Sequence, residues 1–167
     1  YGYHKKIAED LCQSYSEKFG LKVSIVRLFS VYGNGLKKQL LWDACNKILN
    51  TNDEALFWGI GDETRDFIHV DDVVLLFDKV LQENNSFMII NGGTGTKFTI
   101  KQTVELIRSF LAKEIKIEFN NQVNVGNPRY YWTDTKKLNE IGFCDFVDFK
   151  DGLGDYVKWF KKEVLND

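Results

Sequence analysis

The residues best suited to chemistry stand at the start of the chain, where Tyr1 comes four positions before Lys5. On a helix this spacing places both side chains on one face. A phenol has a pKa of about 10, so proton transfer near pH 7 needs roughly 4 kcal/mol of preference for the phenolate. A cation about 4 Å away supplies ~1 kcal/mol in water and ~4 kcal/mol at an effective dielectric of about 20. The pair therefore predicts a general acid–base only inside a closed site, and the spacing alone is more typical of a solvated helix start.

A second group of residues is suited to an anionic or planar ligand. Arg65 follows the glycine-rich loop 59–62 and stands beside Asp66. A guanidinium there is able to grip a phosphate with two parallel hydrogen bonds, whereas an exposed ion pair with a carboxylate is the more common arrangement. Phe57 and Trp58 lie in a short predicted strand, where aromatic side chains stack on a planar base or, more often, fill the core.

Two further segments favour structural roles. The glycine-rich residues 92–95 lie between a predicted strand and a predicted helix, but their spacing differs from G-x-G-x-x-G. That difference favours a tight turn over a phosphate-binding loop. His69 follows the alternation of its strand, which favours a structural residue over a base.

Length and composition restrict the class of protein. The 167 residues suit one domain or a piece of one, and the net charge of −2 gives no indication of a nucleic-acid or membrane-surface partner. Three scattered cysteines and two histidines predict no disulfide frame and no metal site, and they favour a reducing compartment. With no apolar run of about 18 residues and no signal peptide, we expect a cytoplasmic location.

Hydrophobic periodicity predicts alternating helices and strands, which indicates an α/β protein. Asp71 or Asp72 is expected to cap the third helix. The predicted turn is 32–35, the polar loop is 120–127, and 130–132 is extended. The predicted strands are 21–29, 55–58, 65–70, 86–91 and 115–119, and the predicted helices are the segment before Gly20, 36–49, 71–81, 99–110, 135–141 and 149–165.

Four segments, taken in order, resemble the C-terminal half of the extended short-chain dehydrogenase/reductase family. The branch is that of the NAD-dependent nucleotide-sugar epimerases and dehydratases, which includes UDP-glucose 4-epimerase. Residues 1–5 resemble its Y-x-x-x-K catalytic helix, and 26–35 resemble its R-x-F-N-x-Y-G-P-G loop. Residues 65–72 resemble its R-D-F-I-H-V-x-D segment, the most specific of these, and 91–95 resemble its N-x-G-x-G turn.

The resemblance covers essentially the whole chain and implies part of a Rossmann-type fold. We expect residues 1–167 to form a single unit that contains the last parallel strands and helices and the small substrate-binding subdomain. The N-terminal NAD-binding half is expected to be absent, because the chain begins with Tyr1 rather than Met and begins inside a predicted helix. We interpret that start as the sign of a fragment or a processed product.

The resemblance also implies roles for individual residues. Tyr1 would act as acid–base on a sugar hydroxyl or ketone and would also contact the cofactor. Lys5 would bind the nicotinamide ribose and lower the pKa of Tyr1. Leu28 would lie beside the nicotinamide of NAD or NADP, and Arg65 would hold the diphosphate of a nucleotide sugar. The other residues implied to touch the substrate are Phe29 and Ser30 beside the sugar diphosphate, Leu56 and Trp58 at the base, and Tyr131 at the sugar.

The sequence departs from the family pattern at three places. Ser30 stands where the family has Asn, and Asn34 stands where it has Pro. Residues 124–127 read Asn-Val-Gly-Asn, so the second phosphate-binding Arg of the family's R-x-G-D is missing. Arg129 and Lys37 are the candidates to replace that cation.

These observations lead to an expected function and two alternatives. We expect an isomerase or oxidoreductase that epimerises, dehydrates or reduces a nucleotide sugar for polysaccharide biosynthesis, with transient hydride transfer to NAD. The chain alone is expected to hold NAD poorly and to be inactive. The first alternative is a non-catalytic module that binds a sugar nucleotide or a protein without the cofactor half. The second is a fragment that forms a homodimer through its exposed sheet edge.

Overall fold

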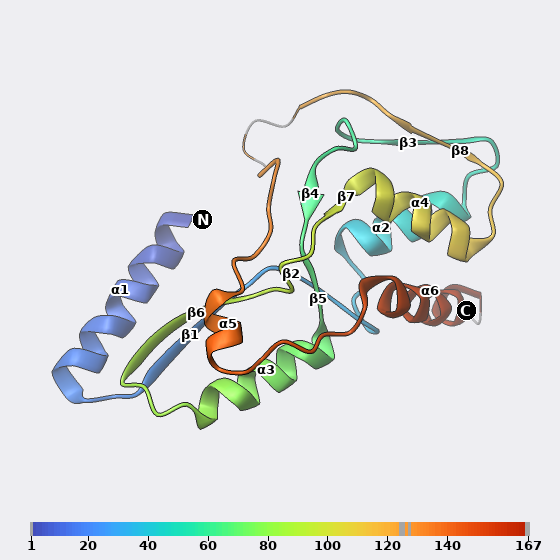
Figure 1. Cartoon of the computed structure of the whole chain (residues 1–167). Coiled ribbons are helices and arrows are strands. Elements are labelled where there is room, and N and C mark those ends of the chain that lie inside the picture. The colour runs from blue at the N-terminus through green and yellow to red at the C-terminus, as the bar shows by residue number, and fades with distance from the viewer. Residues whose placement is uncertain (1, 124–125, 127, 166–167) are drawn as a thin grey trace.

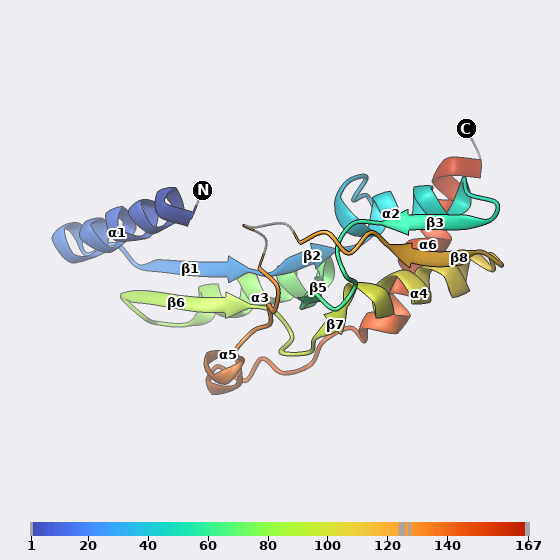
Figure 2. The ribbon, with the colours of Figure 1, turned by 90° about the horizontal axis from the view of Figure 1, so that it is seen from above.

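The computed structural model describes residues 2–123, 126 and 128–165, and it has the predicted α/β architecture. The molecule is elongated (Figures 1 and 2), with α1 and β1 at one end and α2, α4 and α6 at the other. The helices are α1 (Gly2–Phe19), α2 (Gln39–Leu49), α3 (Val70–Gln82), α4 (Ile100–Leu111), α5 (Lys136–Glu140) and α6 (Phe149–Leu165). The strands are β1 (Val23–Leu28), β2 (Ser30–Tyr32), β3 (Glu54–Phe57), β4 (Thr64–Arg65), β5 (Phe67–His69), β6 (Phe87–Gly92), β7 (Phe98–Thr99) and β8 (Lys116–Phe119).

The described strands pair two by two, and three of the four pairs are parallel. β1 pairs with β6, from Val23 opposite Phe87 to Leu28 opposite Gly92. β2 pairs with β5 and β3 pairs with β8, both in parallel, whereas β4 and β7 are antiparallel. Because the chain crosses over between parallel partners, residues far apart in the sequence meet at the ends of these strands.

Some predicted boundaries differ from the structure. The predicted turn at 32–35 is preceded by an extra strand, β2, and the predicted strand at 65–70 is divided at Asp66 into β4 and β5. The second helix begins at Gln39 rather than at 36, because Gly35 has a positive φ of 94° and Lys38 is extended. Local periodicity does not indicate these breaks, because pairing with distant strands decides them.

The cap of α3 was predicted wrongly. The side chain of His69, not Asp71 or Asp72, accepts the N–H of Asp71 through Nδ1 at 3.3 Å. Asp72 is buried inside the first turn, and its carboxylate accepts the N–H of Val147 instead. His69 is thus a structural residue, as its place in the strand predicted.

The larger hydrophobic core lies among α2, α4 and α6. Its members include buried aliphatic and aromatic side chains from each helix, among them Ile48, Val104, Leu153 and Phe160. A smaller cluster joins α3 and β6 to the chain around α5 through Leu76, Ile90, Leu138 and others. The described strands and loops between these two cores carry most of the predicted site residues.

Candidate functional site

One pocket gathers three of the residues predicted to touch the sugar end of a substrate. Phe29, Ser30 and Tyr131 line a cavity of about 540 Å³ together with the loop that follows β2. The rings of Phe29 and Tyr131 stack with their centroids 4.4 Å apart and an interplanar angle of 25°. Two flat aromatic rings beside a hydroxyl suit a ligand with apolar faces and polar edges, which is the chemical character of a sugar ring.

A second pocket holds two guanidinium groups and an indole. Arg65, Arg129 and Trp58 line a cavity of about 240 Å³. Arg65 is oriented by its Nη1, which donates to the carbonyl oxygens of Thr64 at 2.7 Å and Pro128 at 2.9 Å. Within the described residues these two bonds use only Nη1 of the fork, and a nearby guanidinium makes an anion the natural ligand.

Glu63 is the acidic residue of this second pocket, and its carboxylate accepts hydrogen bonds from the backbone of the neighbouring loop. Its carboxylate accepts the N–H of Ile60 at 3.2 Å and of Gly61 at 2.9 Å. Partial burial acts to raise the pKa of Glu63, but these backbone donors and the charge of Arg129 outweigh it and lower that pKa. Glu63 therefore stays ionised and holds the loop, while Arg65 and Arg129 face the cavity.

A third, smaller cavity shares lining residues with both of the others. It measures about 160 Å³, shares Ser30 with the aromatic pocket and shares Arg65 with the cationic pocket. These three neighbouring cavities, lined among others by Tyr131, Ser30, Arg65 and Trp58, are together called the track. Leu56, predicted at the base, is exposed and does not line these cavities; its carbonyl oxygen accepts Lys47 Nζ at 2.7 Å.

The glycine-rich segment that follows β6 surrounds an internal carboxylate. Asp66 is fully buried, and its Oδ1 accepts the N–H of Thr94 at 2.9 Å and the hydroxyl of Thr94 at 2.8 Å. Its Oδ2 accepts the N–H groups of Gly95 and Thr133, both at 2.9 Å. A Cβ at Gly93 would lie 1.9 Å from the Thr133 hydroxyl and 3.0 Å from Asp66 Oδ2, so this close packing requires glycine. The segment is thus a tight turn, as predicted, and two of its donors are not available to a phosphate.

Hydrogen bonds of Asp66 and Thr64 join the segments that line the track, namely those of Ser30, Arg129 and Tyr131. The main-chain oxygen of Asp66 accepts the N–H of Ser30 at 3.0 Å. Thr64 donates its N–H to the carbonyl oxygen of Arg129 at 2.8 Å and accepts the N–H of Tyr131 at 3.1 Å through its hydroxyl. Tyr131 and Arg129 are thereby fixed against strands that come much earlier in the chain.

The residues predicted to bind the cofactor meet in a separate cleft. Lys5 from α1 and Leu28 from the end of β1 line a cavity of about 500 Å³. Tyr1, predicted as the acid–base, lies outside the described residues. Within the described part of the chain no group of three or more metal-ligating side chains occurs, and no helix has the length and apolarity to cross a membrane.

Sequence reasoning missed Asp66 and gave Arg129 no definite place. Asp66 stands between Arg65 and Phe67 in the most specific segment, which is the signal that should have drawn attention to it. Arg129 was only a candidate, because its neighbours in sequence form no recognisable phosphate motif. Lys37, the other candidate, forms an ion pair with Glu163 at 2.6 Å.

Comparisons with known proteins place the chain in a family. A family model described as the NAD dependent epimerase/dehydratase family matches residues 1–93, which is more than half of the chain. The chain therefore belongs to this family. GDP-L-fucose synthase 1 of Arabidopsis thaliana is 30% identical over 118 residues, which are 71% of this chain and 36% of that protein.

Other similar proteins match nearly the whole chain. The dTDP-D-glucose 4,6-dehydratase of Homo sapiens is 28% identical over 172 residues, which cover 99% of this chain and 49% of that protein. The crystal structure of UDP-glucose 4-epimerase from Thermotoga maritima with UDP-glucose has a TM-score of 0.88 at 24% identity, covering 98% of this chain and 54% of that one. The Rossmann-type fold is thereby confirmed, and the chain spans about half the length of these two proteins.

Proposed function

We propose that this chain is the nucleotide-sugar-binding part of an NAD-dependent epimerase, dehydratase or reductase. The observation that carries the proposal is the set of three neighbouring cavities with shared lining residues, with stacked aromatic rings in one and two guanidinium groups beside an indole in another. A nucleotide sugar has the same order of parts, namely a polar ring, a doubly charged diphosphate and a flat base. Related structures are complexes with such ligands, including UDP-glucose and UDP-N-acetylmuramic acid.

Each part of the ligand is assigned to residues by chemistry. Arg65 and Arg129 would hold the diphosphate, because guanidinium groups bind phosphate oxygens with paired hydrogen bonds. Trp58 would stack on the base, since its indole is about three-fifths exposed at the cavity. Phe29, Ser30 and Tyr131 would contact the sugar. Arg129 would thus replace the cation that is missing from residues 124–127.

NAD is the cofactor that the family implies, and the described residues fit one end of it. An ammonium from Lys5 and an apolar side chain from Leu28 line the same cleft, and they would hold the nicotinamide ribose and the nicotinamide, respectively. NAD supplies a hydride acceptor when it is bound. The turn at 92–95 does not suit the pyrophosphate, because Asp66 accepts the N–H groups of Thr94 and Gly95. We propose that the pyrophosphate is held by a part of the intact protein that this chain does not include.

Tyr1 is proposed as the residue that exchanges a proton with the sugar. Its place four residues before Lys5 supports this role, because an ammonium one turn away lowers the pKa of a phenol inside a closed site. Since that closed site needs the cofactor half, the chain alone is proposed to bind the nucleotide sugar without turning it over.

Calorimetric titration of the chain with UDP-glucose, dTDP-glucose and GDP-mannose tests the binding part of this proposal. We expect at least one of them to bind, and Arg65→Gln and Arg129→Gln each to weaken that affinity about tenfold or more, because a hydrogen bond to a charged group contributes ~1.5–3 kcal/mol. The matched control is Lys116→Gln, since Lys116 is exposed on β8 and pairs with Glu118 instead. Equal affinity in the two arginine variants and the control would contradict the assignment.

Turnover separates an enzyme from the alternative of a non-catalytic binding module. The product of the gene that encodes this sequence is incubated with NAD and the nucleotide sugar that binds, and the products are resolved by chromatography. Epimerisation, dehydration or reduction that is lost in Tyr1→Phe supports the enzyme. Binding without conversion supports the module.

A further inference from the structure

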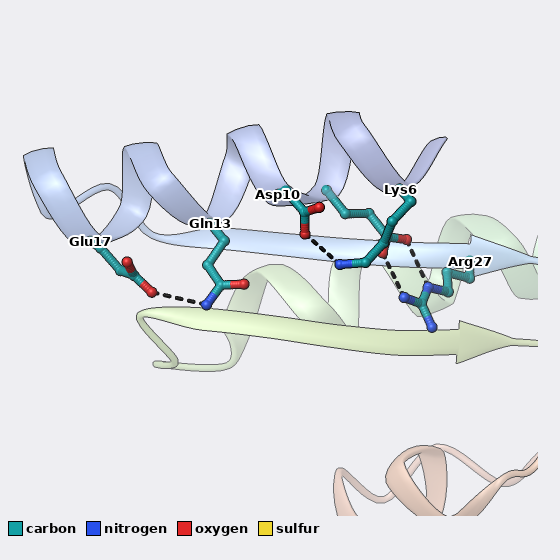
Figure 3. Close-up of polar contacts among 6 residues, drawn as sticks. Lys6, Asp10, Gln13, Glu17 and Arg27 are labelled. Carbon is teal, nitrogen blue, oxygen red and sulfur yellow. Dashed lines mark hydrogen bonds and ion pairs between the residues drawn. The ribbon is translucent and has the colours of Figure 1, made fainter. Parts of the chain in front are cut away.

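One ion pair ties helix α1 to strand β1. Arg27 donates from Nε to Glu9 Oε1 at 2.7 Å and from Nη2 to Glu9 Oε2 at 2.6 Å. Figure 3 shows Arg27 reaching from its strand toward the helix. Two parallel bonds between a planar guanidinium and a planar carboxylate fix both distance and orientation, which a single ammonium does not do.

A second polar contact ties α1 to the rest of the chain. Within Gly2–Phe19 only Ser16 is buried, and its hydroxyl donates to the carbonyl oxygen of Ser86 at 2.9 Å. That contact holds the C-terminal half of the helix. The other polar pairs in Figure 3, Lys6 with Asp10 and Gln13 with Glu17, lie within the helix and do not reach the strand.

The residues of the ion pair are close in sequence to the two residues proposed to hold the nicotinamide end of the cofactor. Glu9 is one helical turn after Lys5, and Arg27 immediately precedes Leu28. All four residues line the same cleft. A change in the separation of Glu9 and Arg27 therefore changes the separation of Lys5 and Leu28 by a similar amount.

Electrostatics favour the paired state near neutral pH. Hydrogen bonding to Arg27 is the largest influence on the carboxyl of Glu9 and lowers its pKa, and the pKa of Arg27 is raised by the same contact. The Arg27 side chain is 50% exposed and that of Glu9 is 13% exposed. Because the Glu9 carboxylate is largely shielded and the contact is bidentate, the pair is of the kind that contributes more than an ordinary surface ion pair.

We propose that Glu9 and Arg27 form a clamp that sets the position of α1 against β1, and that these two residues are positioning residues for the cofactor site. The mechanical part of the proposal does not depend on the proposed function. Its consequence for catalysis does depend on it, because the clamp matters to turnover only if Lys5 and Leu28 hold a cofactor.

Electron paramagnetic resonance distance measurement tests the clamp directly in the 167-residue chain. One spin label is attached at Tyr3→Cys in a Cys12→Ser background, and the other is attached at the exposed Cys144; Cys45 is buried and does not react. We expect Glu9→Gln and Arg27→Gln to broaden the distance distribution at least twofold, and Arg27→Lys to broaden it less. Asp10→Asn is the matched control, since it removes the same charge from the same helix without touching β1.

The charge-swapped pair is the decisive variant. Glu9→Arg combined with Arg27→Glu is expected to restore the narrow distribution, because it rebuilds the same two-bond contact in reverse. Unchanged widths in the single variants overturn the proposal. Broadening that the swapped pair does not reverse also overturns it, because the residues would then act separately rather than as a clamp.

Turnover of the intact gene product tests the positioning role. Glu9→Gln and Arg27→Gln are expected to lower kcat about tenfold with the KM for the nucleotide sugar unchanged, because that ligand binds in another cavity. A rise in KM with kcat unchanged contradicts a role at the cofactor. If the wild-type product turns over no nucleotide sugar, the proposed function fails, while the distance measurement still decides whether the clamp exists.

Discussion

The two ends of this molecule are stabilised in different ways. At the end formed by α2, α4 and α6, the helices bury a continuous core, and Leu153, Tyr156 and Phe160 of α6 are fully inaccessible. At the other end α1 lies beside β1 (Figure 2) and leaves an apolar stripe exposed, which includes Ile7 and Leu11. One end is held by packing and the other by a few polar contacts.

The proposed substrate site and the proposed cofactor site therefore lie in parts of the molecule that are stabilised differently. The proposed nucleotide-sugar track is built on the well-packed end and on the junction beside it, so its geometry does not rely on α1. The proposed cofactor cleft lies between α1 and β1, and Ser16 is the one buried residue of Gly2–Phe19. Elements with few buried contacts open at low free-energy cost, so we expect α1 to exchange its amide hydrogens faster than α4 or α6.

The largest effect is expected from truncating a core residue at the packed end. Leu153→Ala removes a fully buried side chain and is expected to lower the free energy of unfolding by about 3 kcal/mol, through lost transfer energy and the cavity that remains. The matched change on the other end is Leu11→Ala, at a residue 58% exposed, which is expected to cost less than about 0.5 kcal/mol. Urea denaturation measures both. Equal losses would mean that α1 is packed in solution, for example in a homodimer, and the contrast between the ends would fail.

A second effect is expected at the junction, where Asp66 joins β5 to the turn at 92–95 and to Thr133. Asp66→Asn replaces one acceptor oxygen by an NH₂ group that cannot accept, and leaves buried N–H groups unpaired. We expect a loss of about 3 kcal/mol in unfolding free energy, because an unsatisfied buried group costs ~1–3 kcal/mol. Urea denaturation measures this loss of unfolding free energy. Titration with UDP-glucose measures whether the affinity for the nucleotide sugar falls with it.

Thr94→Val is the control for that change, since it removes one hydroxyl donor and leaves the backbone donors to Asp66 in place. It is expected to cost about 1 kcal/mol and to leave the affinity for the nucleotide sugar unchanged. If Asp66→Asn is no more harmful than Thr94→Val, the carboxylate does not organise the junction.

The smallest effect is expected at Tyr32, below the aromatic pocket. Its side chain is 2% exposed, and within the described residues its hydroxyl has no hydrogen-bond partner. Burial, with the charges of Asp72, Asp148 and Asp151, raises the pKa of Tyr32, so the hydroxyl stays neutral. Tyr32→Phe is therefore expected to leave the unfolding free energy unchanged or to raise it by up to about 1 kcal/mol. A loss of more than about 1 kcal/mol in urea denaturation would show that the hydroxyl has a partner in solution.

Local patterns in the sequence were enough for the architecture. The apolar periodicity of α2 and α4 and the β-branched run of β1 each depend on neighbours within a few residues, so a single sequence contains that information. The motif order pointed to the family and to some of the residues that line the track, namely Phe29, Ser30, Trp58, Arg65 and Tyr131. These predictions rest on short-range regularities that the tertiary structure preserves.

Tertiary structure decided which groups meet. Asp66 accepts donors from residues 28 and 67 positions away, and no local pattern marks a carboxylate as the partner of distant N–H groups. The same holds for Arg129 beside Arg65, for Arg27 opposite Glu9, and for His69 replacing Asp71 as the cap of α3. Helices and strands arise from contacts that repeat along the chain. A site depends on single pairs of donors and acceptors that are far apart in the sequence. The assembled fold decides which of these groups meet, because it sets the geometry of the crossovers between strands.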